Sequence, residues 1–213
     1  KAGLANVGDT ESQPIRAVRG YAGATVSLDI LQDAAPGSGS FNTTVDSDGI
    51  VRRVPLFVAH KGKVYPGLAL EALRVAQRDP QTGASPTFLI KMAGGGGEVA
   101  LGNPNRMIGV KVGAIEVPST EDGQLWVHYT PEVAERRVPA WKILANAPKL
   151  AQLEGAAVFI GTSAAGLLDL RSTPMRLDAP GVEVHIQALE QMLLKDFLER
   201  PDWATGAELG FAV

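Results

Sequence analysis

The sequence contains no cysteine and only three histidines among its 213 residues. Without cysteine, the chain can form no disulfide framework, no thiolate zinc or iron–sulfur site and no thiol nucleophile. Cysteine-free proteins occur in the cytosol and in the periplasm, so this absence does not locate the protein. The stretch Asp46-Ser47-Asp48-Gly49 starts like a calcium loop, but the required glycine and closing glutamate are missing. We therefore expect no metal and no cofactor.

The sequence also lacks a strong charge of either sign and a long hydrophobic run. Its 20 basic and 23 acidic residues leave a net charge of -3, which gives no electrostatic reason to expect nucleic acid as a partner. The longest apolar run, residues 155–168, is too short for a membrane span and is interrupted by Thr162 and Ser163. With 45% hydrophobic and 20% charged residues, the composition is that of an ordinary globular domain.

Both ends of the sequence indicate a piece of a longer protein. The chain begins at Lys1 rather than at a methionine, and no signal peptide is recognisable. Its last residues, 209–213, are apolar and are compatible with the first turn of a membrane helix. We expect membrane attachment through flanking helices that are not part of this sequence.

Apolar spacing and turn residues predict an α/β fold. Asp-Gly pairs between β-rich runs indicate two hairpins, over residues 41–60 and 115–129. Helices are expected over residues 28–35, from Pro66 onward, over 141–144 and over 182–199. This order of elements favours a mixed β-sheet that is flanked by helices and carries inserted β-hairpins.

Two of the expected helices have a predicted buried face. In the helix that starts at Pro66, the apolar positions are Leu68, Ala69, Ala72, Leu73 and Ala76. Its charged residues Glu71, Arg74 and Arg78 are expected on the opposite face. The second helix is expected to pack through Val182, Ile186, Leu189, Leu193 and Phe197.

The stretch from Gly155 to Pro174 carries the strongest functional signal. A very apolar run, residues 156–160, ends abruptly at Gly161-Thr162-Ser163. Such a run is typical of a buried strand that leads into a polar loop at one edge of a sheet. Ligands of open α/β sheets usually bind beyond the carboxyl ends of the strands. We therefore predict a functional loop over residues 161–174.

Ser163 invites comparison with a hydrolase nucleophile. A nucleophile elbow has the pattern Gly-x-Ser-x-Gly, with a histidine and an acid later in the chain. Here the spacing before Ser163 fits, but two residues instead of one separate Ser163 from Gly166, although Asp169 and His185 follow. The alternative, that Thr162 and Ser163 hydrogen-bond backbone groups at a strand end, is favoured by this spacing.

Two groups of charged residues are further candidates. Asp169, Arg171 and Thr173 occupy alternating positions, so in an extended loop they would line one side of a crevice. An Asp169–Arg171 pair that locks the loop is the alternative, and the sequence does not decide between the two. Asp48 and Arg52, with Arg53 beside them, are expected to form a structural ion pair near a strand, or part of the ligand site.

Several segments in order resemble one protein family, the CHASE domain, type 2. They are GSFNTTVDSDGIVRRVPL (39–56), YPGLALEALR (65–74), GQLWVHY (123–129), VFIGTSAAGLLDLRSTP (158–174), PGVEVHIQALEQML (180–193) and RPDW (200–203). Members are bacterial extracytoplasmic sensors found ahead of adenylate and diguanylate cyclases, histidine kinases and protein kinases. The resemblance covers about residues 28–208.

The resemblance implies that residues 1–213 form a single extracytoplasmic sensor domain. The family normally has more α/β sequence before the position of Leu31, so we expect an N-terminally truncated domain, with residues 1–27 unassigned. It implies a periplasmic or extracellular position, attached to the inner membrane. No defined family ligand transfers to this chain, so only the position of the distinctive segment, residues 161–174, is carried over.

Three hypotheses of function follow. The first is an input domain without catalysis that senses a small molecule or stress signal, with a possible homodimer as the signalling unit. Its candidate site residues are Thr162, Ser163, Asp169, Arg171, Thr173, Asp48 and Arg52. The second is a serine hydrolase that uses Ser163, and the third is a purely structural dimerisation module. The first is our preferred interpretation.

Overall fold

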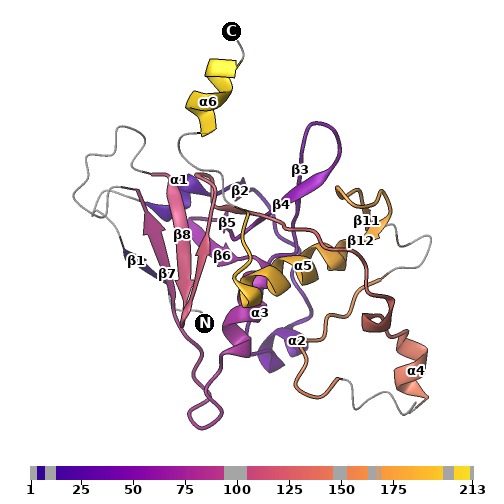
Figure 1. Ribbon diagram of the computed structural model, residues 1–213. Coiled ribbons are helices and arrows are strands. Elements are labelled where there is room, and N and C mark those ends of the chain that lie inside the picture. The colour runs from indigo at the N-terminus through magenta and orange to yellow at the C-terminus, as the bar shows by residue number, and fades with distance from the viewer. Residues whose placement is uncertain are drawn as a thin grey trace.

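The computed structural model describes residues 4–7, 13–93, 105–145, 153–162, 167, 169–198 and 204–211. Their strands form four small sheets that contain both parallel and antiparallel pairs. Helices lie against these sheets, and the short helix α6 stands apart near the C-terminus (Figure 1). The prediction of an α/β fold with mixed strands and flanking helices is confirmed.

The largest sheet has the strand order β1-β7-β8-β9. β1 (Leu4–Val7) runs parallel to β7 (Phe88–Met92), whereas β8 (Met107–Val112) and β9 (Ile115–Pro118) follow in antiparallel order. In β7 the side chains of Phe88, Ile90 and Met92 are buried and alternate with less buried ones, as expected for a strand with one face on the core.

A bent strand connects two of the smaller sheets. β3 (Thr44–Val45) and β4 (Val51–Pro55) form the predicted first hairpin, with Gly49 at a φ of 84° in its turn. After Leu56 the chain continues as β5 (Phe57–His60), which pairs with β6 (Lys63–Pro66) and with β2 (Gly20–Tyr21). The Leu56 N–H donates to Gly123 O at 2.9 Å, which ties the bend to the next segment.

The second predicted hairpin, over residues 115–129, is wrong. β9 pairs with β8 across the tight turn at Gly113, and β10 (Gln124–Trp126) pairs with β4 instead. A backbone turn does form between them, because the Thr120 N–H donates to Gln124 O at 2.7 Å. The strands on either side of this turn then diverge, since each has a longer partner strand elsewhere.

Two helices form the centre of the core. α3 (Leu68–Ala76) and α5 (Gly181–Leu194) pack against each other and against the sheets. The shorter predicted helices are confirmed as α2 (Asp29–Ala34) and α4 (Ala140–Leu144). The remaining elements are α1 (Pro14–Ala17), the 3-10 helix η1 (Ala134–Arg136), β11 (Leu170–Arg171), β12 (Ala179–Pro180) and α6 (Ala204–Phe211).

The predicted polar face of α3 is wrong for two of its residues. Glu71 and Arg74 are 4% and 5% exposed, and they form an ion pair of 2.7 Å. The pair fits because Gly37 and Gly39 pass directly over it: a Cβ on Gly37 would lie 2.0 Å from Glu71 Oε1. The segment that contains Gly37 and Gly39 therefore covers the face of α3 that helical spacing alone assigns to solvent.

α5 differs from its prediction in length and in face. It ends at Leu194 rather than at 199, because Lys195 adopts a left-handed conformation with a φ of 57°. Leu189 is buried as predicted, whereas Leu193 is 50% exposed. The buried face is rotated toward Gly181, Val184, His185, Ala188, Leu189, Gln191 and Met192.

The predicted buried strand over residues 156–160 is wrong. Residues 156–162 form no strand in the structure, and Ile160 is 95% and Val158 52% exposed. Phe159 is partly buried against the core, and Gly161 lies against Val182 of α5, whose Cγ1 would be 2.5 Å from an added Cβ. An apolar run becomes a strand only where a neighbour offers its edge, and none of the described strands pairs with this segment.

Candidate functional site

The structure brings the two predicted charged groups next to each other at the start of α5. Ile50 forms an isolated bridge with Ser172, and the Val51 N–H donates to Ser172 O at 2.8 Å. β11 in turn pairs with β12, so residues 169–173 lie beside the residue at which α5 begins. Residues 46–53 and 169–173 are therefore neighbours, although the sequence separates them by more than 100 positions.

Asp169 and Arg171 form an ion pair of 3.1 Å, and both side chains are a little over one-third exposed. The backbone of Asp169 accepts the Gly181 N–H at 2.8 Å, and its carboxylate covers Gly181, where a Cβ would lie 2.6 Å from Oδ1. A carboxylate at a helix N-terminus is electrostatically favourable. The ion pair of the locking alternative is thus present, while a ligand contact of these residues stays a prediction.

Thr173 is buried and closes the turn that follows. Its hydroxyl donates to Arg176 O at 3.0 Å and accepts the Arg176 N–H at 3.2 Å. These bonds use the hydroxyl as donor and as acceptor, so Thr173 shapes the loop. They also fix the start of the Arg176 side chain.

Asp46 lies between two arginines of β4. Arg52 and Arg53 donate to its two carboxylate oxygens at 2.9 and 2.6 Å, and Arg52 also pairs with Asp48 at 2.6 Å. The hydrogen bonds from Arg53 and then Arg52 lower the pKa of Asp46. The guanidinium of Arg52 lowers the pKa of Asp48 to about 2. Asp46, Asp48 and Arg52 are therefore charged at neutral pH, as the expected structural ion pair requires.

Arg53 has a second contact that orients it. Its guanidinium lies 5.0 Å from the centre of the Trp126 ring, within the range of a cation–π interaction. Arg52 and Arg53 are consecutive residues of β4, yet both reach Asp46, which directly follows the irregular end of β3. The sequence predicted the charges but not this shared partner.

The hydrolase residues are only partly described. Thr162 is exposed, and Ser163 lies outside the described residues. His185 is 3% exposed and donates from Nε2 to Phe41 O at 3.1 Å, since a carbonyl oxygen can only accept. Burial lowers the pKa of His185, so its imidazole is neutral at pH 7. This nitrogen is therefore not available as a base.

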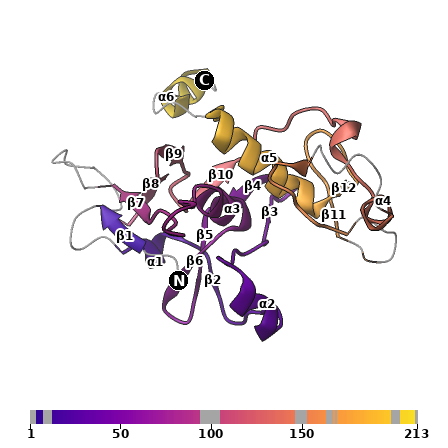
Figure 2. The same cartoon turned by 90° about the horizontal axis from the view of Figure 1, so that it is seen from below.

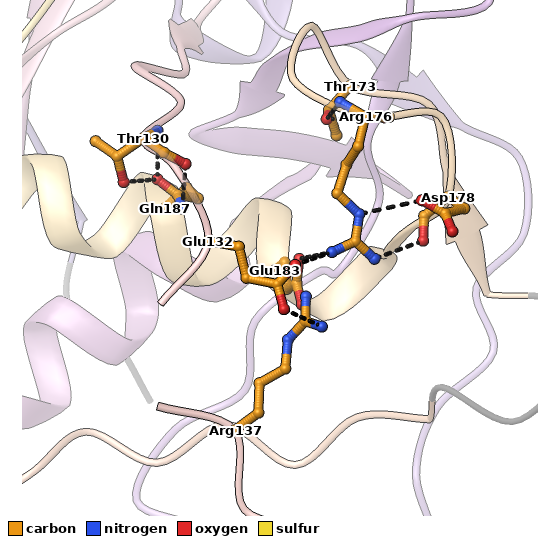
Figure 3. A network of polar contacts seen from close by, with 8 residues as sticks. All are labelled: Thr130, Glu132, Arg137, Thr173, Arg176, Asp178, Glu183 and Gln187. Atoms are coloured by element: carbon orange, nitrogen blue, oxygen red, sulfur yellow. Dashed lines mark hydrogen bonds and ion pairs between the residues drawn. The ribbon is translucent and has the colours of Figure 1, made fainter. Parts of the chain in front are cut away.

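Sequence reasoning missed a network of ion pairs beside the predicted site (Figure 3). Arg176 donates to Glu132 at 2.5 Å and to Asp178 Oδ1 at 3.2 Å. Arg137 pairs with Glu132 at 2.5 Å and also with Glu183 in the first turn of α5. Three chain segments thus meet at one helix end, and separations of 44 and 46 residues left no local signal.

Two glutamines, one turn apart on α5, hold the end of β10 and the extended segment that follows it. Gln191 is buried; its amide donates to Trp126 O at 2.8 Å and accepts the His128 N–H at 2.6 Å. Gln187 accepts the Thr130 N–H at 3.1 Å. These side chains replace a neighbouring strand, since they satisfy backbone groups that a β-ladder would otherwise pair.

α5 connects this site to the C-terminal part of the described chain. β11, β12 and α4 gather at one end of the helix, and the chain leads from its other end toward α6 (Figure 2). Within the described ranges, no cluster of three histidine, aspartate or glutamate side chains is arranged to hold a metal ion. None of the helices among the described residues is long and apolar enough to cross a membrane.

Comparison with protein families places the chain among the extracellular sensor domains. The family is the CHASE2 domain, whose model matches residues 4–212, and the chain belongs to it. This confirms the resemblance noted in the sequence, over a longer stretch than the quoted segments. Neither the curated proteins nor the solved structures gave a match. Membership in this family establishes a sensory role and an extracellular position as properties of the domain family.

Proposed function

We propose that this chain is the signal-sensing input domain of a membrane-bound bacterial signalling protein, with a nucleotide cyclase or a histidine kinase as the output and no catalysis of its own. Membership in the CHASE2 family supports the sensory role. Its stimulus is a small molecule or a stress signal, received on the outer side of the inner membrane. A homodimer is the proposed signalling unit.

One observation supports this proposal most: Gly161 and Asp169, both in the 161–174 loop, contact the start of α5, and the chain leads from the end of α5 toward the C-terminus. Asp169 covers the first residue of the helix, and Gly161 lies against Val182 in its first turn. From its other end, the chain leads toward α6 (Figure 1). A displacement of the 161–174 loop therefore acts directly on the helix nearest to the C-terminal connection.

The proposed ligand-contacting residues are Thr162, Ser163, Asp169, Arg171, Asp48 and Arg52, while the buried Thr173 belongs to the site as the residue that shapes its loop. Arg52 and Arg171 offer guanidinium groups at the surface, each already held by a carboxylate. A ligand transmits a signal only if it binds one arrangement of these groups more tightly than the other. Competition with the Asp169–Arg171 pair supplies such a difference.

The test uses the full-length parent protein in membranes. Its output, cyclic nucleotide or phosphorylation, is measured during shifts of NaCl and pH and on addition of an amino-acid mixture. Replacing both Asp169 and Arg171 with Ala is expected to abolish the response that the wild type shows. The matched control replaces Lys91 and Glu116, an exposed ion pair of 2.7 Å on the β7–β9 sheet, and keeps the response. An unchanged response of the first variant would refute the site.

A further inference from the structure

Residues 130–137, here called the strap, lie on the surface of α5 without being part of a sheet. All eight are exposed. The backbone hydrogen bonds made by the strap residues among themselves are local ones: Arg136 N–H donates to Val133 O at 3.0 Å and Arg137 N–H to Ala134 O at 3.1 Å. The strap therefore lacks both a buried side chain and a β-ladder to hold it in place.

What holds the strap is a row of polar side chains on one side of α5. Gln187 accepts from the backbone and the hydroxyl of Thr130, at 3.1 and 3.0 Å. Arg136 pairs with Glu190 at 2.7 Å. Arg137 pairs with Glu183, a contact drawn in Figure 3 together with the Thr130–Gln187 bonds.

A fourth contact ties the strap to the loop between β11 and β12. Glu132 binds both Arg137 and Arg176 at 2.5 Å, and Arg176 also lies 3.8 Å from Glu183. The side chains of Arg136, Arg137 and Glu132 are 59%, 42% and 40% exposed. Ion pairs with this exposure are weak and are screened by dissolved ions, more so than buried pairs.

We propose that the strap is an electrostatic latch on α5, which closes at low ionic strength and is released as ionic strength rises. In the closed state the ion pairs neutralise Arg136, Arg137 and Glu132 of the strap and Glu183 and Glu190 of α5, and the Thr130–Gln187 hydrogen bonds add an uncharged contact. In the released state water and dissolved ions solvate the same charges. Because salt stabilises the released charges and screens the closed pairs, it shifts the equilibrium toward release.

Release would change the surroundings of α5 in a defined way. It would uncover the Glu183–Glu190 side of the helix and remove Glu132 from Arg176, which keeps its contacts with Asp178 and Thr173. The role of this change in signalling rests on the proposed function. The latch itself is a property of the 213-residue chain and is tested on that chain alone, so the two proposals can fail independently.

The test is amide hydrogen exchange by NMR at about 20 mM and about 1 M NaCl, where the screening lengths differ several-fold. The amides of Thr130, Arg136 and Arg137 report on the strap. Val127, whose N–H donates to Arg52 O at 2.9 Å, is the internal reference, because it lies in the same segment but outside the strap. Protection of the strap amides is expected to fall about fivefold or more relative to Val127.

Two variants separate the latch from a general effect of salt. Arg137→Gln removes two ion pairs of the strap, so its amides should exchange quickly already at low salt and respond little to added NaCl. Arg106→Gln removes an exposed ion pair of 2.9 Å with Glu121, away from the strap, and should behave as the wild type. Strap protection that is unchanged by NaCl, or unchanged in Arg137→Gln with Val127 still protected, would overturn the latch.

Discussion

Glu71 and Arg74 show how single residues adapt to their surroundings. Both guanidinium and carboxylate are buried, with two hydrogen bonds of 2.7 and 2.8 Å between them. The pair is possible because Gly37 and Gly39 carry no Cβ that would collide with it. Buried charges need such complete pairing, since a lone buried charge costs several kcal/mol. Arg74 also faces the Phe88 ring at 5.7 Å.

His185 makes the stability of the chain depend on pH. Burial lowers its pKa in the folded state, so between that value and the ordinary 6.5 the unfolded state binds the proton more readily. Above about pH 6.5 His185 is neutral in both states and does not change the free energy of unfolding with pH. Below about pH 6.5 its protonation in the unfolded state lowers the free energy of unfolding. Denaturant unfolding at pH 7.5 and 5.5 should show a smaller loss of unfolding free energy for His185→Gln than for the wild type. An equal loss in both proteins would contradict this assignment.

At the scale of elements, the sequence correctly predicted those helices and turns that depend on residues close together in the chain. The hairpin around Gly49, the helices α2 and α4 and the start of α5 follow from turn residues and helical spacing within a few positions. Its failures depend on distant partners. Residues 156–160 are apolar enough for a buried strand but have no neighbouring strand, and β10 pairs with β4 rather than with β9. The site shows the same division: its charges were found, whereas the partners Glu132, Arg137 and Arg176 were not.

The two glutamines of α5 should contribute unequally to stability. Gln191→Ala leaves the Trp126 carbonyl and the His128 N–H unpaired in a partly buried place, which is expected to lower the free energy of unfolding by about 2 kcal/mol. Gln187→Ala exposes its partners on Thr130 to water, so its effect should stay below about 1 kcal/mol. Urea denaturation measures both. Equal effects would show that Gln191 does not replace a strand in the way described.

For the whole molecule, the geometry combines a sensor-family fold with one helix, α5, that contacts Asp169 of the candidate site and several polar groups of neighbouring segments. Asp169, Glu183, Gln187 and Gln191 place contacts along the length of α5, from its first residue toward its C-terminal end. The sheets and α3 behind it form the packed core, with buried residues such as Phe57, Phe88 and Leu73. Under the proposed function, changes at the surface of the domain reach the C-terminal part through α5.

The most direct test of this route separates α5 from α6 in the full-length protein. A Gly-Gly-Ser insertion between Phe197 and Leu198 leaves the sensor intact but makes the connection flexible. The account predicts that the output then no longer responds to stimuli that activate the wild type. The same insertion in the turn between Lys61 and Gly62, which joins β5 to β6, should leave the response intact. A full response with the connection interrupted would contradict signalling through α5.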